Sequence, residues 1–403
     1  MNKTINLQIK PNFIEQYKKG YPLITPEYIF DLEDIDDGTI VNLVDNKKRF
    51  ISKGYLGRQN KGYGWVLSLK DEQIDTDFFK IKIKEALDYR DDFFKSSDTT
   101  AFRVFNSQGD GIGGLTIDYF SESNNQAGCY MITWYSNGIY KFKKQIVDAL
   151  EAQVNYKAIY QKKRFDTKGQ YIDDKDDFVS GERVDFPIQI KENGVHFAIY
   201  LDDGPMTGIF LDQKVVRKTI MTKYSKGKTI LNTFSYTGAF SVYAALGGAL
   251  KTTSVDLANR SFEKTAEQFK INNIDPSTQD IIVEDVFHYF KYAVKKNMLF
   301  DMVVVDPPSF ARSKKNTFSV SKDYTKLLKE IIQITKKGGM IVASTNYANL
   351  NMKRFRDFID KAFKESNSKY IIEDVYALPK DFKVSKSFLE SDYLKVIFIK
   401  KIK

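Results

Sequence analysis

Between residues 229 and 345 the chain alternates short apolar runs with segments of helical periodicity, and this alternation restricts the fold more than any other feature. The runs read TILNTF, TTSVD, DIIVED, FDMVVVD and GGMIVAS. Strands that are apolar along their whole length belong to parallel sheets covered by helices on both faces. The sequence therefore predicts an α/β, doubly wound domain, which we assign to residues 184–403.

Two smaller parts precede this domain. In KRFISKGYLGRQNKGYGWVLSL apolar residues alternate with polar ones and glycines recur, which predicts a small β-barrel-like module over residues 1–72. Residues 73–183 mix an amphipathic helical stretch, DFFKIKIKEALDYRDDFF, with strands such as CYMITWYS, and this predicts a small α+β domain. A chain of 403 residues is long enough for three such domains.

Charge and cysteine content narrow the classes of function. The net charge of +10 favours a polyanionic partner such as nucleic acid. One cysteine and two histidines exclude a disulfide framework and leave no set of ligands for a metal site, so we predict no metal and a reducing, cytoplasmic setting. No apolar stretch approaches the ~20 residues of a membrane helix, and the start MNKTINLQIK lacks the apolar core of a secretory signal.

The residues that end the predicted strands are the candidate ligand-binding residues, because ligands of such sheets bind beyond the carboxyl ends of the strands. The first strand runs into a turn with Gly238, which we expect to allow close backbone approach to a ligand. Asp256 ends the second strand, 18 residues later, where a carboxylate can accept hydrogen bonds from both hydroxyls of a ribose. Asp285 follows the third strand, where it can meet an adenine amino group.

The glycine pattern of the first turn separates two nucleoside cofactors. A dinucleotide pyrophosphate needs G-x-G-x-x-G, but here Tyr236 and Phe240 flank the single glycine, Gly238. S-adenosylmethionine has a ribose and an adenine but no phosphate, so it tolerates the bulkier turn. We therefore predict S-adenosylmethionine as the cofactor in preference to NAD.

The segment after the fourth strand predicts the chemistry. It comprises Asp306, Pro307, Pro308, Ser309 and Phe310. The prolines fix the backbone, so the carboxylate can be held against a planar substrate while the phenyl ring offers a surface for stacking. This arrangement suits methylation of a nitrogen in a base that has left its stack.

The motifs together resemble those of the S-adenosylmethionine-dependent 23S ribosomal RNA methyltransferases, which have an N-terminal PUA module, a small central α+β domain and a Rossmann-like class I methyltransferase domain. The matching stretches are GDGIGGLTIDYF, TGIFLDQKVVR, LNTFSYTGAFSVYAALGGA, SVDLANRSFEKTAEQFKINN and VVVDPPSF. The resemblance implies a 23S rRNA or large-subunit precursor substrate and a homodimer. It also implies cofactor contacts by Phe210, Asp212, Gln213, Phe234, Tyr236, Gly238, Asp256 and Asp285.

This family contains cytosine-C5 and guanine-N7 enzymes. Cytosine C5 becomes nucleophilic only after a thiolate adds to C6, so that reaction needs a well-placed cysteine. The single cysteine, Cys129, lies in the apolar run CYMITW, and the place of the nucleophile in the cytosine branch is taken by Asn346. Guanine N7 carries an available lone pair, so positioning suffices. We therefore predict guanine N7, with Asp306, Pro307, Pro308, Phe310 and Asn346 at the site of methyl transfer.

Other interpretations stay open at this stage. An exocyclic amine of a base is a second target for the Asp-Pro-Pro-aromatic segment, and cytosine C5 is a third. A non-catalytic RNA-binding assembly factor and an NAD-linked oxidoreductase are the alternatives from other classes. Arg312, Lys314 and Lys315 follow Phe310 and are equally compatible with an RNA-contacting loop and with a solvated one.

Overall fold

The computed structural model describes residues 4–30, 35–59, 62–123, 126–165, 177–204, 206–312 and 317–403. It divides into two compact units. Unit 1 comprises Met1–Gly194, Ile199–Thr207 and Lys380–Ser391, and unit 2 comprises Val195–Ala198, Gly208–Pro379 and Asp392–Lys403. The boundaries 1–72, 73–183 and 184–403 stay a prediction.

The N-terminal part of unit 1 is a five-stranded sheet in the order β1-β3-β4-β5-β2. Its strands are β1 (Ile5–Gln8), β2 (Leu23–Ile24), β3 (Ile40–Val44), β4 (Phe50–Gln59) and β5 (Gly62–Ser68), with helix α1 (Ile14–Lys18) after β1. Side chains from these elements, among them Ile9, Tyr17 and Val41, form a small core of their own. This part confirms the predicted module of short strands.

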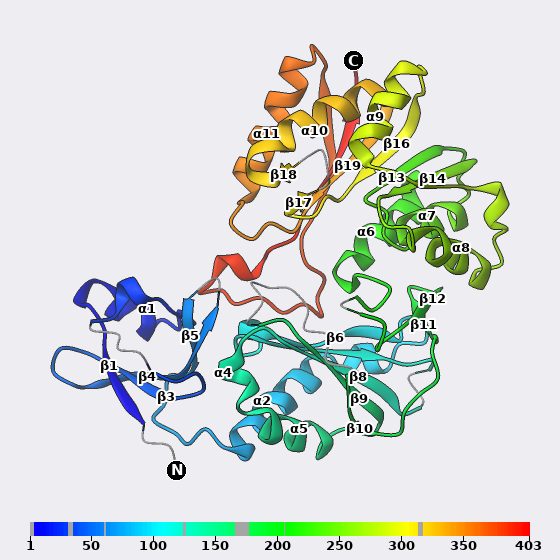
Figure 1. The fold of residues 1–403 in the computed structure, drawn as a ribbon. Helices are drawn as coiled ribbons and strands as arrows, with labels where there is room; N and C mark the ends of the chain where they lie inside the picture. Colours follow the sequence, from blue (N-terminus) through cyan, green and yellow to red (C-terminus); the bar gives the residue numbers. More distant parts are fainter. Residues whose placement is uncertain are drawn as a thin grey trace. The chain divides into compact units, whose positions relative to one another are not determined.

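The central part of unit 1 is a second five-stranded sheet, in the order β10-β9-β8-β7-β6. Its strands are β6 (Ala101–Asn106), β7 (Leu115–Phe120), β8 (Gly128–Trp134), β9 (Tyr156–Lys163) and β10 (Phe178–Gly181). The helices are α2 (Thr76–Tyr89), α3 (Asp91–Phe94), α4 (Asn137–Tyr140) and α5 (Lys143–Glu151). Helices α2 and α5 cover one face of this sheet (Figure 1), where Phe79 and Ile146 share a core with Ile117.

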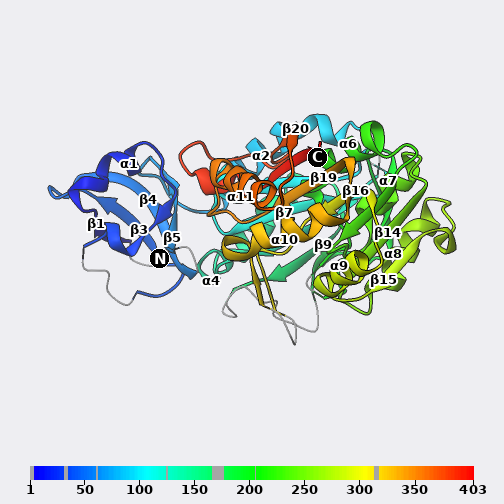
Figure 2. The ribbon, with the colours of Figure 1, turned by 90° about the horizontal axis from the view of Figure 1, so that it is seen from above.

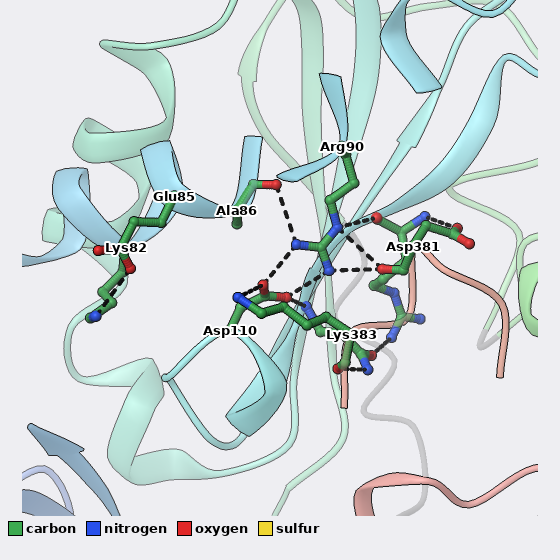
Figure 3. Close-up of polar contacts among 9 residues, drawn as sticks. Lys82, Glu85, Ala86, Arg90, Asp110, Asp381 and Lys383 are labelled. Atoms are coloured by element: carbon green, nitrogen blue, oxygen red, sulfur yellow. Dashed lines mark hydrogen bonds and ion pairs between the residues drawn. The ribbon is translucent and has the colours of Figure 1, made fainter. Parts of the chain in front are cut away.

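The segment Lys380–Ser391 lies between two strands of unit 2 in sequence but packs in unit 1. Arg90 is fully buried and forms a bidentate ion pair with Asp110, with both N···O distances at 2.7 Å. A second bond from Nη2 of Arg90 reaches the Asp381 carbonyl oxygen at 2.7 Å (Figure 3). The Lys383 carbonyl accepts from the side chain of Asn106 at 2.9 Å.

Close approach also anchors this segment. A Cβ on Gly109 would lie 1.8 Å from the Lys383 carbonyl oxygen, so this position admits only glycine. Farther along, the Phe388 ring packs edge-on against Tyr21 and Trp65 of the N-terminal sheet, each at 5.8 Å between ring centroids. Gly109, Asp110 and the N-terminal part of unit 1 thus hold the segment Lys380–Ser391 in place. We call this segment the tether.

Unit 2 contains a seven-stranded sheet in the order β15-β14-β13-β16-β19-β21-β20. The strands are β13 (Thr229–Thr233), β14 (Lys251–Asp256), β15 (Asp280–Val283), β16 (Phe300–Val305), β19 (Thr335–Thr345), β20 (Tyr370–Tyr376) and β21 (Lys395–Lys401). The first five in this order are parallel, and β21 runs antiparallel to both of its neighbours. Outside the three larger sheets, β11 (Ile188–Glu192) pairs with β12 (Val195–Ile199), and β17 (Phe310–Arg312) pairs with β18 (Thr317–Ser319).

Helices cover both faces of this sheet, which confirms the doubly wound prediction. The helices are α6 (Lys214–Thr219), α7 (Ala239–Leu246), α8 (Ser261–Ile271), α9 (Val286–Lys295), α10 (Val320–Ile334) and α11 (Met352–Glu365). Successive residues of β16 alternate between two cores: Val303 packs with α9, α10 and α11, and Val304 packs with α6 and α7. Figures 1 and 2 show the helices around the sheet. Strand β16 is therefore buried on both sides, which explains its continuous apolar sequence.

The strand order reverses between β13 and β16, since β14 and β15 extend to one side and β19 to the other. At such a switch point the loops that follow the two central strands diverge and leave a crevice for a ligand. The candidate site is therefore built on the ends of β13 and β16. Among the helices that the structure describes, none has the length and apolar character that crossing a membrane requires.

We expect Arg90→Met to destabilise unit 1 by about 3–5 kcal/mol, because buried Asp110 would keep only the longer ion pair with Lys383, at 3.6 Å, in place of its bidentate partner. Both tryptophans of the chain, Trp65 and Trp134, lie in unit 1, so urea unfolding followed by tryptophan fluorescence reports this unit alone. Lys95→Met, which breaks an exposed ion pair, is the matched control and should leave the midpoint unchanged. An unchanged midpoint for Arg90→Met would show that the buried Arg90–Asp110 ion pair does not stabilise unit 1.

Candidate active site at the β13–β16 switch point

The turn after β13 is strained. Phe234 and Tyr236 have φ angles of 54° and 52°, in the left-handed region that bulky residues avoid, at a cost of about 1–3 kcal/mol each. Two hydrogen bonds hold the turn in place: the Ser235 N–H donates to the Val255 carbonyl at 3.1 Å, and the Tyr236 N–H donates to the Asp256 carboxylate at 2.8 Å. Strain of this kind marks a turn whose shape serves a function.

Gly238 ends this turn with φ 74° and begins α7. A Cβ here would lie 2.4 Å from the Thr265 methyl group of α8. Glycine is therefore required by the backbone conformation and by the packing of α7 against α8. The close backbone approach to a ligand that the sequence predicted for Gly238 stays a prediction.

The two predicted acidic residues lie at the ends of neighbouring strands. Asp256 ends β14 and accepts backbone N–H groups of Tyr236 at 2.8 Å and Ala258 at 2.9 Å. A carboxylate offers about four acceptor positions, so two remain for the hydroxyls of a ribose. Asp285 caps the start of α9, where its Oδ1 accepts the N–H of Phe287 at 2.9 Å. Both side chains thus have their orientation fixed by the backbone.

A segment that precedes the sheet packs on the strained turn. The Gly208 N–H donates to the Tyr236 hydroxyl at 3.0 Å, and the Thr237 hydroxyl donates to the Gly208 carbonyl at 2.7 Å. The Phe210 ring lies 5.4 Å from the Tyr236 ring and stays 45% exposed. The Phe234 ring, on the same turn, packs edge-on against Phe287 at 6.1 Å.

Gln213 joins this segment to the end of β16. Its buried amide nitrogen donates to Asp306 Oδ2 at 3.1 Å and to the Ser344 hydroxyl at 2.9 Å. Its Oε1 is also buried, and within the described part of the chain it accepts no hydrogen bond. A buried acceptor without a donor costs about 1–3 kcal/mol, so this oxygen is suited to a donor on a ligand.

Burial raises the pKa of the Asp306 carboxyl from its ordinary 3.8 to about 6. The Asp212 carboxylate acts in the same direction, while hydrogen bonds from Ser344 and Gln213 oppose it. Asp212 itself accepts a hydrogen bond from the Tyr393 hydroxyl at 2.8 Å. A carboxyl with this pKa ionises close to neutral pH, which is typical of functional sites.

The structure also brings Asn346 to the segment after β16. Asn346 follows β19, and its Oδ1 accepts the Ser309 hydroxyl at 2.7 Å. Pro307 is buried and Pro308 exposed, while Phe310 is 62% exposed. This bond fixes the Asn346 amide and leaves its NH₂ group to face another acceptor. Lys314 and Lys315 lie outside the described residues, as does the side chain of Arg312.

The sequence did not identify Ser344, Tyr324 and Tyr393 as part of this network. The Tyr324 hydroxyl donates to the Ser344 carbonyl at 2.7 Å and so fixes the end of β19. Tyr393 reaches Asp212 because β21 is inserted beside β19, a placement that no local pattern shows. Among the described residues, no three or more His, Cys, Asp or Glu side chains lie close enough together to hold a metal ion. Nδ1 of His288 lies 3.1 Å from the Glu284 carboxylate.

Comparison with known proteins agrees with this geometry. Residues 140–387 match the family model of S-adenosylmethionine-dependent methyltransferases, and residues 7–69 match that of PUA-like domains. The first match spans more than half of the chain. The chain belongs to the S-adenosylmethionine-dependent methyltransferases. It is therefore an enzyme that uses S-adenosylmethionine, and the NAD-linked oxidoreductase and the non-catalytic assembly factor are wrong.

Individual relatives cover nearly the whole chain. A Bacillus subtilis (strain 168) protein, named provisionally as the ribosomal RNA large subunit methyltransferase YwbD, is 54% identical over 98% of this chain and 99% of its own. Ribosomal RNA large subunit methyltransferase I of Aeromonas salmonicida (strain A449) is 27% identical over 90% and 91%. A crystal structure of a provisionally assigned methyltransferase complexed with SAH has 38% identity and a TM-score of 0.89, and the alignment covers 98% of this chain and 99% of that one.

The residues at the switch point fit this cofactor. Spare acceptor positions on Asp256 suit ribose hydroxyls, and the buried Oε1 of Gln213 suits an amino group. The turn presents no run of free amides for a pyrophosphate, because the Tyr236 N–H already donates to Asp256. The assignment of the cofactor contacts stays a prediction for all eight residues: Phe210, Asp212, Gln213, Phe234, Tyr236, Gly238, Asp256 and Asp285.

We expect Asp306→Asn to stabilise the protein at neutral pH and not at acid pH. Because the pKa of Asp306 is raised, the contribution of its neutral carboxyl to the free energy of unfolding is complete below about pH 4. This contribution is lost as pH rises through about 6. Asparagine cannot ionise, so it avoids a loss of roughly 3 kcal/mol. Urea unfolding of both proteins, followed by circular dichroism at pH about 4.5 and 7.5, measures the difference.

Asp301→Asn is the control of opposite sign. Burial would raise the pKa of Asp301, but its hydrogen bonds with Thr229 and Lys336 hold it below the ordinary value. Its substitution should therefore cost stability at neutral pH. Equal pH dependence for Asp306→Asn and the wild type would show that Asp306 ionises normally.

Proposed function

We propose that this enzyme methylates a base of 23S rRNA, at N7 of a guanine. Full-length relatives carry names that specify large-subunit ribosomal RNA, and the PUA-like match together with the net charge of +10 supports an RNA substrate. The choice of N7 depends on the environment of the chain's one cysteine.

Cys129 lies in β8 of unit 1, where it pairs with Phe120 and Ala158 of the flanking strands and is 3% exposed. Burial raises the pKa of its thiol to about 11. A nucleophilic cysteine requires the opposite, a depressed pKa and access to the substrate. This observation carries the proposal, because C5 methylation of cytosine needs a thiolate and N7 methylation of guanine does not.

In the proposed reaction the target guanine leaves its stack and lies against the segment from Asp306 to Phe310. S-adenosylmethionine would supply an electrophilic methyl group: the N7 lone pair would bond to it as the methyl–sulfur bond breaks, and S-adenosylhomocysteine would leave with the electron pair. The Phe310 ring stacks on the base, and the NH₂ of Asn346, fixed by Ser309, donates to the guanine O6. Ionised Asp306 favours the positive charge that N7 methylation leaves on the base.

An exocyclic amino group is the second candidate, because the same segment offers the Asp306 carboxylate as an acceptor for an N–H.

The homodimer stays a prediction of the family resemblance, and light scattering of the purified protein tests it.

Deletion of the gene is expected to remove one 7-methylguanosine from 23S rRNA. Mass spectrometry of nucleosides from cells with and without the gene measures this loss, and expression of the wild-type gene should restore the nucleoside. Loss of 5-methylcytidine instead would make the cysteine argument wrong, and loss of an N-methylated exocyclic amine would favour the second candidate.

Cys129→Ala and Asn346→Ala should separate the two chemistries. We expect the first to retain methyl transfer within about twofold, since the thiol is not used, and the second to lose roughly a hundredfold in kcat through one missing hydrogen-bond donor. Transfer of a labelled methyl group to 23S rRNA measures both. The reverse pattern, with activity lost only in Cys129→Ala while S-adenosylmethionine binding persists, would identify a cysteine-dependent enzyme.

A further inference from the structure

The Asp306 side chain has hydrogen-bond donors but no counter-ion. It is partly buried, and within the described part of the chain it forms no ion pair. Its hydrogen bonds come from the Gln213 amide, at 3.1 Å, and from the Ser344 hydroxyl. An amide and a hydroxyl orient a carboxylate but bring no charge that balances it. An ionised Asp306 therefore leaves an unbalanced negative charge at the end of β16.

Charged and titratable groups face Asp306 from several elements. Burial is the main reason that the pKa of Asp306 is raised to about 6, and the Asp212 carboxylate acts in the same direction. The hydrogen bonds of Asp306 and the Arg217 guanidinium of α6 oppose this shift. From α10, burial holds the pKa of Tyr324 far above its ordinary value, so that this hydroxyl stays neutral. Asp306 is thus the group among these whose ionisation changes close to neutral pH.

A second acceptor lies beside this carboxyl. Oε1 of Gln213 is buried and accepts no hydrogen bond from the described residues, while the nitrogen of the same amide donates to Asp306 and Ser344. A charged acceptor and a neutral one are therefore joined through one amide. Such a pair stabilises a ligand that brings both N–H donors and positive charge. S-adenosylmethionine has an ammonium and a sulfonium, whereas its product S-adenosylhomocysteine keeps the ammonium and has a neutral sulfur.

We propose that Asp306 distinguishes the cofactor from its product by charge: its carboxylate stays ionised beside S-adenosylmethionine and takes up a proton from water when S-adenosylhomocysteine is left in the site. The inference rests on the prediction that the cofactor binds at this switch point, and it holds for any target base. In the transfer the methyl–sulfur bond breaks, the electron pair stays on sulfur and the positive charge passes to the base. Once the base departs, no cation balances the carboxylate, so its neutral form is favoured.

Binding of S-adenosylmethionine should therefore depend on pH, and binding of S-adenosylhomocysteine should not. In the free protein Asp306 is half protonated at pH about 6. A sulfonium that lowers this pKa by about one unit makes the Kd for S-adenosylmethionine fall about fivefold from pH about 5 to about 7. It also releases about 0.4 of a proton per molecule bound at pH about 6. The product should release none, and its Kd should change by less than about twofold.

Isothermal titration calorimetry of the full-length protein with each ligand measures both quantities. The Kd is determined at pH about 5, 6 and 7, and proton release is obtained from the heats in buffers of different ionisation enthalpy. Asp306→Asn keeps the size of the side chain and an oxygen acceptor for Gln213, and it should abolish the pH dependence and the proton release with S-adenosylmethionine. The matched control is Asp374→Asn, the same substitution in the same unit at a carboxylate that accepts from Tyr224 and pairs with Lys223. It should behave as the wild type does.

Asp212→Asn gives a graded readout in a protein that keeps Asp306. Because the Asp212 carboxylate raises the pKa of Asp306, its removal should move the inflection of the Kd for S-adenosylmethionine to lower pH. Circular dichroism checks that each variant is folded. An inflection that stays in place or moves to higher pH would contradict the proposal, also in the case that Asp306→Asn binds neither ligand.

The wild type alone already decides the main point. Equal proton release with the two ligands would overturn the proposal, because the charge on sulfur would then have no effect on the site. Release that persists in Asp306→Asn would overturn it as well, because another group would be titrating. No RNA enters these measurements, so their failure leaves the proposed methylation of guanine N7 standing. Loss of a different nucleoside from cells would overturn N7 and leave this proposal intact.

Discussion

The buried ion pair of Arg90 and Asp110 is the contact on which the architecture of unit 1 depends. Two charges out of water are stable only when each is paired and its remaining hydrogen-bonding groups are satisfied. Arg90 meets this condition with Asp110, with the Ala86 carbonyl and with the Asp381 carbonyl, which lies 291 positions away in the chain. Unit 1 therefore includes Lys380–Ser391, a segment that lies between two stretches of unit 2 in the sequence.

Because of this arrangement, the chain passes between the two units more than once. The tether begins after β20 and ends just before Tyr393, which donates to Asp212 in the candidate cofactor segment. The Phe388 ring places the same tether against the N-terminal sheet. The chain thus leaves unit 2 after Pro379, passes through Lys380–Ser391 of unit 1 and returns to unit 2 at Asp392, so neither unit can be excised as one continuous fragment.

At the candidate active site, strain and burial are concentrated on two strand ends. The turn after β13 keeps Phe234 and Tyr236 at positive φ, and the end of β16 keeps Asp306 largely out of water with its pKa raised to about 6. Gln213 connects the two by bridging Asp306 and Ser344. Rigid elements on both sides maintain these unfavourable states, as expected where a planar substrate and a charged cofactor must be held in one geometry.

Several features followed from local sequence. Continuous apolar runs predicted parallel strands buried on both faces, and the order of strands then located Asp256, Asp285 and Asp306 at strand ends. The packing of Gly238 did not follow from local sequence, because the Thr265 methyl group that excludes a side chain there comes from a different helix. A contact between two helices cannot be predicted from the residues that neighbour Gly238 in the sequence.

The sequence by itself thus determined the fold class, the type of cofactor and the residues that follow each strand, because strand periodicity and turn composition are local properties of the chain. Only the tertiary structure decided which of those residues meet. Gln213 reaches Ser344 across 131 positions, and Asp381 reaches Arg90 across 291. Such contacts depend on the order in which strands join a sheet, and that order is set by the burial of whole elements against each other.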